Sequence, residues 1–241
     1  IHKARTFIEK AFSQPIETPN LIEADKVGYT AEESKQLAKP EKCLFKKMYW
    51  AFTKKGLCFA SRTSDGVKLG IETGFDSGST LDYVYRNQPT GLTAFGRFLD
   101  FKYLDAIGWR GIRQRKVNLE KILKSAIETQ QADKKDVHIV DVAAGHGRYI
   151  LETVNQLPKK PKSILLRDYS ELNVEKGTDL IAQKGLTKIA TFERGNAFSE
   201  EELSNLTTKP TIAIVSGLYE LFGENHLLQS SLKGLANSME E

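Results

Sequence analysis

The chain has 241 residues, of which 40% are hydrophobic, and a formal net charge of +4. It can bury a sizeable core in one large or two small domains. Two cysteines, Cys43 and Cys58, do not make a disulfide scaffold, and neither lies in a zinc-like cluster. No apolar run approaches the roughly 18 residues of a membrane span, and the first residues lack a secretory signal. These features predict a soluble cytoplasmic protein.

Basic residues are concentrated in the first half of the chain. Residues 1–116 hold 20 Lys and Arg against 13 Asp and Glu, whereas residues 117–241 hold 15 against 18. This basic N-terminal half could attract an anionic acceptor or an anionic surface. Ordinary solvated lysines explain the same count, and we favour that explanation. No RNA-binding motif is present, so no nucleic-acid partner is predicted.

Residues 1–63 are predicted to form a helical appendage and linker. A helical stripe of apolar residues comes first, Pro15 and Pro19 then break it, and Thr30 with Glu33 gives a capping box that opens a short helix. The stripe consists of Ala4, Phe7, Ile8, Ala11 and Phe12.

The segment from Lys42 to Phe59 mixes lysines with aromatic residues. A basic aromatic helix can sit on a membrane surface or a partner. We expect instead that the aromatic side chains pack on the neighbouring core while the lysines stay in water.

Residues 64–116 are predicted to form a lid or front wall over a site. Their first part is rich in hydrogen-bonding side chains: Asp76, Ser77, Ser79, Thr80, Asp82, Tyr83, Tyr85, Arg86 and Asn87. A loop held by its own hydrogen bonds, with turns at Gly74 and Gly78, is an equally good reading. Arg110, Arg113 and Arg115 could hold a phosphate or carboxylate, although an exposed helix face has the same spacing.

The organising stretch is Val137 to Glu152. Ile139, Val140 and Val142 give a buried parallel strand, and Gly145 and Gly147 then allow a sharp turn. A helix begins at Arg148, so a ligand over the turn is expected to face free backbone N–H groups.

Strands and helices alternate around this turn. A lead-in helix is predicted to begin at Asn118, and strands are predicted over 163–166, 189–192 and 211–215. Ser170 can cap the helix after the second strand, and Ser199 with Glu202 the helix after the third. This alternation predicts an α/β fold with a parallel sheet and right-handed crossovers over residues 117–241.

The acidic residues help to separate two nucleotide-binding motifs. A dinucleotide fingerprint has a third glycine where this chain has Ile150, which argues against it. Asp141-x-Ala143-x-Gly145-x-Gly147 instead resembles the first motif of class I S-adenosylmethionine-dependent methyltransferases, with Ala143 in place of the usual first glycine. In that family the first acid lies near the methionine end of the cofactor.

Later strands extend the resemblance. Asp168 follows the second strand, 21 residues beyond Gly147, where a ribose-binding acid is expected. Asn196-Ala197 follows the third strand, where the family often has an Asp-Ala pair that contacts adenine, and the amide of Asn196 offers both a donor and an acceptor. Ser216 begins a run to Phe222 at the usual position of residues near the substrate and the methyl group.

Four longer runs carry a closer resemblance, to a bacterial family of class I methyltransferases that often follow a lysophospholipase-like α/β-hydrolase in one chain. The match begins near Ser64 and includes the runs 74–87, 107–115, 166–170 and 216–222. It implies S-adenosylmethionine as cofactor, a small-molecule or lipid-like acceptor, and a fused or associated hydrolase.

The resemblance also implies site residues. Cofactor contacts fall on Asp141, Ala143, Gly145, His146, Gly147, Arg148, Asp168, Tyr169, Asn196, Ala197 and Ser216. Tyr219 could orient the acceptor and Glu220 could take a proton or bind a cation, while core packing is the alternative for Tyr219. For His146 a structural role is favoured over catalysis.

The family sheet has the strand order 3-2-1-4-5-7-6, and only the first four strands are counted here. Because the fourth, over 211–215, is too apolar for an open edge, we expect a further C-terminal part or a partner to cover it. Two other functions are alternatives: a regulatory module that binds S-adenosylmethionine without turnover, and, less favoured because of Ile150, a nicotinamide-dependent oxidoreductase.

Overall fold

A computed structural model describes residues 44–222 and 224–239. The predicted helix over 4–12 and the capping box at Thr30 lie outside these residues. The helices are α4 (Leu44–Ala60), α5 (Asp65–Thr73), α6 (Gly78–Arg86), α7 (Ala94–Leu104), α8 (Ile107–Ala132), α9 (Arg148–Gln156), α10 (Glu171–Gln183), α11 (Glu200–Ser204), the 3-10 helix η1 (Tyr219–Leu221) and α12 (Asn225–Ser238). The strands are β1 (His138–Val142), β2 (Ser163–Asp168), β3 (Ala190–Arg194) and β4 (Ile212–Val215).

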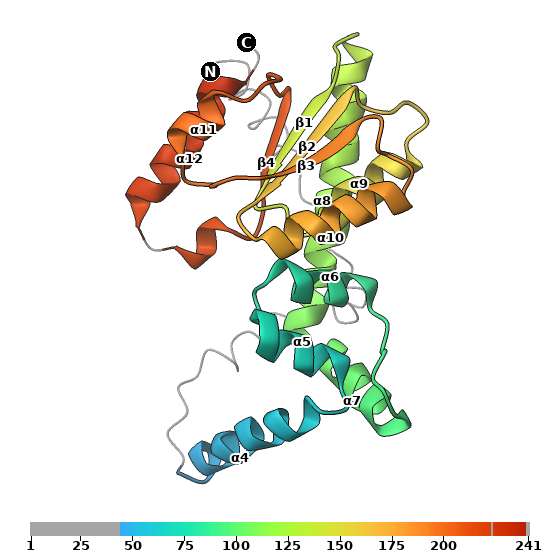
Figure 1. The fold of residues 1–241 in the computed structure, drawn as a ribbon, viewed down its shortest axis with the longest axis vertical. Helices are drawn as coiled ribbons and strands as arrows, with labels where there is room; N and C mark the ends of the chain where they lie inside the picture. Colours follow the sequence, from blue (N-terminus) through green and yellow to red (C-terminus); the bar gives the residue numbers. More distant parts are fainter. Residues whose placement is uncertain (1–43, 223, 240–241) are drawn as a thin grey trace, which may run out of the picture.

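The four strands form one parallel sheet in the order β3-β2-β1-β4 (Figure 1). β1 is central, and Asp141 is in register with Leu166 of β2 and with Ile214 of β4. The predicted α/β fold with a Rossmann-like parallel sheet is therefore confirmed, in the expected strand order. Since β2 and β4 leave β1 on opposite sides, the carboxyl end of β1 is the switch point at which such sheets bind ligands.

Helices cover both faces of the sheet (Figure 1). Side chains alternate along β1, so Ile139 enters one core and Val140 and Val142 enter the other. The first core includes side chains of α8, α9 and α10: Leu123, Ile127, Ile150, Leu151, Val154, Leu180 and Ile181. The second is smaller and is closed by Leu203 of α11 and Leu235 of α12.

The lead-in helix differs from the prediction. α8 begins at Ile107 and not at Asn118, and it runs without interruption to Ala132 over 26 residues. Its start has no side-chain cap, because Ala106 occupies the N-cap position, so the usual sequence signal is missing. Of the described helices, none is both long and apolar enough to cross a membrane.

The predicted lid segment is helical, and a buried carboxylate connects two of its parts by hydrogen bonds. Asp100 of α7 is fully buried, and its Oδ1 accepts a hydrogen bond from the backbone N–H of Gly66 at 3.0 Å. Its Oδ2 accepts from the N–H of Gly91 at 2.7 Å. Because these donors lie in α5 and in the loop before α7, one side chain holds both in place.

The aromatic side chains of α4 do not pack as predicted. Phe45, Phe52 and Phe59 are 81%, 68% and 66% exposed. The expectation that aromatic residues of this segment pack on the core is therefore wrong for these three.

The outer edge of the sheet lies at β4. Among the described strands β4 pairs only with β1. Its residues Ile212 to Val215 are half-buried, because α11 and α12 cover one face of the strand.

Candidate active site

The turn after β1 has three left-handed residues. Ala143, Gly145 and Gly147 have φ values of 58°, 59° and 68°. A Cβ on Gly147 would lie 2.3 Å from Cδ1 of Leu166, so only glycine fits against β2 there. Ala143 adopts the same left-handed backbone although it carries a Cβ, in a conformation that normally favours glycine.

Several N–H groups of this turn are used within the protein. Ala144 donates to the carbonyl of Arg167 at 3.0 Å, and Gly147 donates to the carbonyl of Ala144 at 2.8 Å. Gly145 donates to Oδ2 of Asp168 at 2.9 Å. The prediction that the turn presents free N–H groups is wrong for these three residues.

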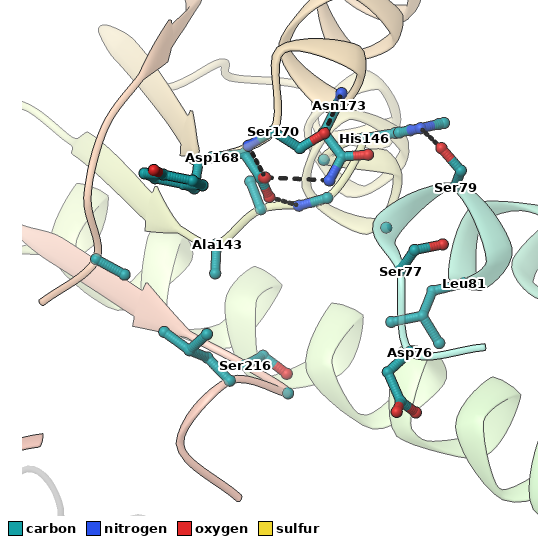
Figure 2. Close-up of a pocket in the computed structure, with 18 of the residues that line it drawn as sticks. Asp76, Ser77, Ser79, Leu81, Ala143, His146, Asp168, Ser170, Asn173 and Ser216 are labelled. Carbon is teal, nitrogen blue, oxygen red and sulfur yellow. Dashed lines mark hydrogen bonds between the residues drawn. The ribbon is translucent and has the colours of Figure 1, made fainter. Parts of the chain in front are cut away.

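Asp168 is held in one orientation at the end of β2. Besides Gly145, its donors are the N–H of Ser170 at 2.9 Å and Nδ2 of Asn173 at 3.0 Å, both to Oδ1 (Figure 2). An ionised carboxylate has about four acceptor positions. One position on Oδ2 is therefore left for a ligand hydroxyl in the cavity that Asp168 lines.

Ile150 occupies the position of the third glycine in a dinucleotide motif. It is fully buried in the core between α9 and the sheet. A glycine there would leave a void, because this core is built around the larger side chain. The structure thus gives Ile150 a packing role that the dinucleotide motif lacks.

The amino end of α6 closes one side of the turn. A Cβ built on Gly78 would lie only 2.6 Å from Cα of Gly145. Beside this contact, Oγ of Ser79 lies 3.1 Å from Nε2 of His146, as Figure 2 shows. Residues almost 70 positions apart in the chain thus form one wall of the site.

Asp82 of α6 is the charged link between this helix and the turn. Its Oδ2 lies 3.1 Å from Nη2 of Arg148 and 3.5 Å from Nδ1 of His146, and Arg86 approaches the same oxygen at 3.1 Å. Burial raises the pKa of Asp82, but hydrogen bonds from His146 and Arg148 outweigh it and lower the pKa to about 2. His146 and Arg148 therefore have structural partners.

Asp141 lies beneath the turn and is 1% exposed. Burial raises its pKa to about 8; the hydroxyl of Tyr149 lowers it and the charge of Asp168 raises it. In the part of the chain described, no hydrogen bond of normal geometry reaches Oδ2 of Asp141 or the hydroxyl of Tyr149. A cation in the cavity above would favour the ionised form of Asp141.

These elements surround a cavity of about 490 Å³. Ten of the predicted cofactor residues line it: Ala143, Gly145, His146, Gly147, Arg148, Asp168, Tyr169, Asn196, Ala197 and Ser216. Asp141 does not line it.

Tyr219 and Glu220, predicted to contact the acceptor, also lie off the lining. The hydroxyl of Tyr219 is 2.8 Å from Oγ of Ser231 in α12, which ties η1 to the last helix. Glu220 is exposed, and its Oε1 pairs with Nη1 of Arg115 at 3.2 Å. Both stay predictions, with structural partners that the sequence did not suggest.

The side of the cavity predicted to hold adenine is formed by the loop after β3. The carbonyl oxygen of the Asn196 side chain accepts from the N–H of Phe198 at 2.9 Å, which orients the amide and leaves its NH₂ group and one lone pair of the oxygen for a ligand. Sequence reasoning missed Phe198, Leu172 and Asn173, which also line the cavity. The spacing of Asn173, three residues after the cap Ser170, was the one available signal.

Phe198 meets Phe222 edge to face, with ring centroids 4.7 Å apart. Leu218 and Leu221 continue this apolar wall from the end of β4, and Leu81 and Tyr85 line the cavity from α6. The cavity thus combines a polar side, at the turn, Asp168 and the start of α6, with one apolar wall.

Comparison with known proteins supports a methyltransferase family. A family model described as "Putative methyltransferase" matches residues 4–241. Protein YnbC of Escherichia coli (strain K12) is 53% identical over 191 residues, which is 79% of this chain. The chain spans 32% of the length of YnbC.

Two solved structures are remote likenesses. A methyltransferase from Thiobacillus denitrificans, in complex with S-adenosylhomocysteine, is 16% identical with a TM-score of 0.35, over 50% of this chain and 43% of its own. The glycopeptide N-methyltransferase MtfA, with sinefungin, is 14% identical with a TM-score of 0.38, over 48% and 45%. The family assignment rests on the family model, and the chain belongs to the family described as "Putative methyltransferase".

Proposed function

We propose that the chain uses S-adenosylmethionine to methylate a small-molecule or lipid-like acceptor. The observation that carries the proposal is the oriented carboxylate of Asp168, held by Gly145 of the glycine turn at 2.9 Å and facing the cavity at the switch point of the sheet. A ribose hydroxyl is the group that such an acid accepts from in nucleotide sites.

The residues present fit this cofactor. Asp168 would accept from the ribose, and the NH₂ group of Asn196 with the ring of Phe198 would face the adenine. The buried carboxyl of Asp141 has one oxygen without a partner among the described residues, and it lies under the turn where a cationic methionine end would be stabilised.

When bound, S-adenosylmethionine supplies a methyl group on an activated sulfonium. The chain then has to hold donor and acceptor in line, within about 3–3.5 Å of each other. Asp82, through Arg148 and His146, keeps α6 and the turn in fixed positions for this purpose. The paired rings of Phe198 and Phe222 would exclude water from the same space.

The apolar wall supports an acceptor with an apolar part. Leu81, Leu218, Leu221 and Phe222 offer it no charged group, and the lining residues His146 and Arg148 are already paired with Asp82. Asp76, in the loop before α6, is an exposed carboxylate that also lines the cavity. Because Tyr219 and Glu220 do not line the cavity, they would contact an acceptor only at the edge of the apolar wall or after it moves. A fused or associated α/β-hydrolase stays a prediction from the sequence resemblance.

The test uses S-adenosylmethionine with a tritiated methyl group. The purified chain is incubated with a bacterial extract that has been separated into water-soluble and chloroform-soluble fractions. We expect label in one fraction, and at least a tenfold loss of transfer with Asp168→Ala. Asp179→Ala, on the exposed side of α10, is the matched control and should transfer label normally.

Two results would count against methyl transfer. Cofactor binding without label in either fraction would favour the regulatory module. Equal transfer by Asp168→Ala and the parent would remove the assigned ribose contact.

A further inference from the structure

Helix α7 has apolar side chains on two opposite faces. One face is buried against α5 and includes Leu104. The other displays Phe95, Phe98 and Phe101, which are 59%, 54% and 52% exposed and follow each other at three-residue spacing. Single exposed apolar side chains are normal on a protein surface, whereas three neighbouring phenylalanine rings form a continuous patch. The exposed face of α7 therefore has the character of a contact surface.

Cations lie directly beside these rings. The ammonium of Lys102 is 5.8 Å from the ring centre of Phe98 and 5.6 Å from that of Phe101. Residues 44–116 contain 13 Lys and Arg against six Asp and Glu. Two of the six acids, Asp82 and Asp100, are buried and bonded, while Arg86, Arg115 and Lys116 pair with carboxylates, so an excess of cations remains in this part of the chain.

Helix α4 repeats this composition. Its exposed Phe45, Phe52 and Phe59 fall seven residues apart, and the guanidinium of Arg62 lies 5.5 Å from the ring centre of Phe59. Both helices lie at the end of the molecule away from the sheet (Figure 1). This end thus carries two helices with exposed aromatic rings and neighbouring cations.

We propose that the exposed face of α7 docks on the surface of an anionic lipid bilayer. The face consists of Phe95, Phe98 and Phe101, with Leu92 just before the helix and with Lys102 and Arg97 beside the rings. Phenylalanine rings enter the boundary of the acyl chains, while lysine and arginine meet anionic headgroups. Protein interfaces, by contrast, draw most of their affinity from Trp, Tyr and Arg. None of these face residues lines the cavity, so this proposal stands apart from the cofactor site.

Vesicle sedimentation of the 241-residue chain tests the proposal. Vesicles of phosphatidylglycerol and phosphatidylcholine in equal parts are compared with vesicles of phosphatidylcholine alone. We expect at least tenfold tighter binding to the anionic vesicles, weakened by added salt. The affinity for the anionic vesicles should fall at least tenfold in the triple variant F95S/F98S/F101S and at least tenfold in the charge variant R97E/K102E.

The control variant I122S/L232S removes side chains that are 65% and 55% exposed elsewhere on the molecule, and it should bind as the parent does. Since all substituted side chains are exposed, each variant should keep the parent's urea midpoint. Absence of binding to both vesicles, or binding of the triple variant like the parent, would overturn the proposal. A concentration-dependent dimer that the triple variant abolishes, without vesicle binding, would assign the face to a second copy instead.

Discussion

Gly78 of α6 and Gly145 of the glycine turn meet backbone against backbone. A Cβ on Gly78 would come within 2.6 Å of Cα of Gly145 and 2.7 Å of Nδ2 of Asn173. The N-terminal helices and the sheet are thus joined at the wall of the cavity that we propose holds the cofactor. Any side chain at this contact would push α6 away from the turn.

Gly78→Ala should therefore weaken both stability and cofactor binding. Overpacking of this kind costs about 1–3 kcal/mol of unfolding free energy, and displacement of α6 should lower cofactor affinity. Gly108→Ala in α8 is the matched control, because its Cβ would meet nothing within 4 Å. The measurements are urea unfolding and calorimetric titration. Equal losses in the two variants would show that the contact with Gly145 has no special role.

Ala143 should tolerate glycine better than valine. Its φ of 58° costs an alanine roughly 1–2 kcal/mol, which glycine does not lose. Glycine also increases the conformational entropy of the unfolded chain, which lowers the stability by about 0.4–1 kcal/mol. Ala143→Gly should therefore be neutral or slightly stabilising. Ala143→Val should be clearly destabilised, because a β-branched residue is strained at positive φ. Urea midpoints in the reverse order would contradict the left-handed backbone at this position.

Asp82 should stabilise the fold in a pH-dependent way. Its folded pKa of about 2 lies below the ordinary 3.8, so its contribution is present above about pH 4 and is lost as the pH falls through 2. The shift corresponds to about 2 kcal/mol. The difference in unfolding free energy between the parent and Asp82→Asn should shrink by about this amount from pH 5 to pH 2.

Asp136→Asn is the control for Asp82. Asp136 pairs with Lys162 on the surface, where an ion pair contributes little. Its substitution should leave the unfolding midpoint near that of the parent. If Asp82→Asn behaved in the same way at every pH, the link from α6 to Arg148 would not stabilise the protein.

The contribution of Asp141 to stability should depend on pH in the direction opposite to that of Asp82. Because its folded pKa of about 8 is raised, its contribution is fully present below about pH 4 and is lost as the pH rises through 8. Asp141→Asn stays neutral, so its stability relative to the parent should improve by on the order of 4 kcal/mol between pH 5 and pH 8. Urea unfolding at the two pH values measures this. A constant difference would mean that Asp141 is ionised in the folded protein throughout.

The sequence was sufficient to predict the sheet and much of the polar edge of the site. Ser170 and Ser199 cap α10 and α11 as predicted, since local capping chemistry is written in neighbouring residues. Gly145 and Asp168 meet because parallel strands end at one edge of the sheet. Here local pattern and overall topology agree.

The helices before the sheet could not be predicted in the same way. α6 buries polar residues such as Asp82, whose partners Arg148 and His146 lie more than 60 positions further along the chain. A periodicity analysis expects apolar residues on a buried face and so misses this helix. The roles of Tyr219 and Glu220 were equally hidden, because their contacts with Ser231 and Arg115 depend on tertiary packing.

Calorimetric titration with S-adenosylmethionine and S-adenosylhomocysteine, with NAD as a control, tests the central claim most directly. We expect both sulfur nucleotides to bind, NAD not to bind, and Asp168→Ala to weaken binding by about 2–3 kcal/mol through the lost charge-assisted hydrogen bond. Binding of NAD alone, or an Asp168→Ala variant that binds S-adenosylmethionine as tightly as the parent, would contradict the assignment of this cavity to the cofactor.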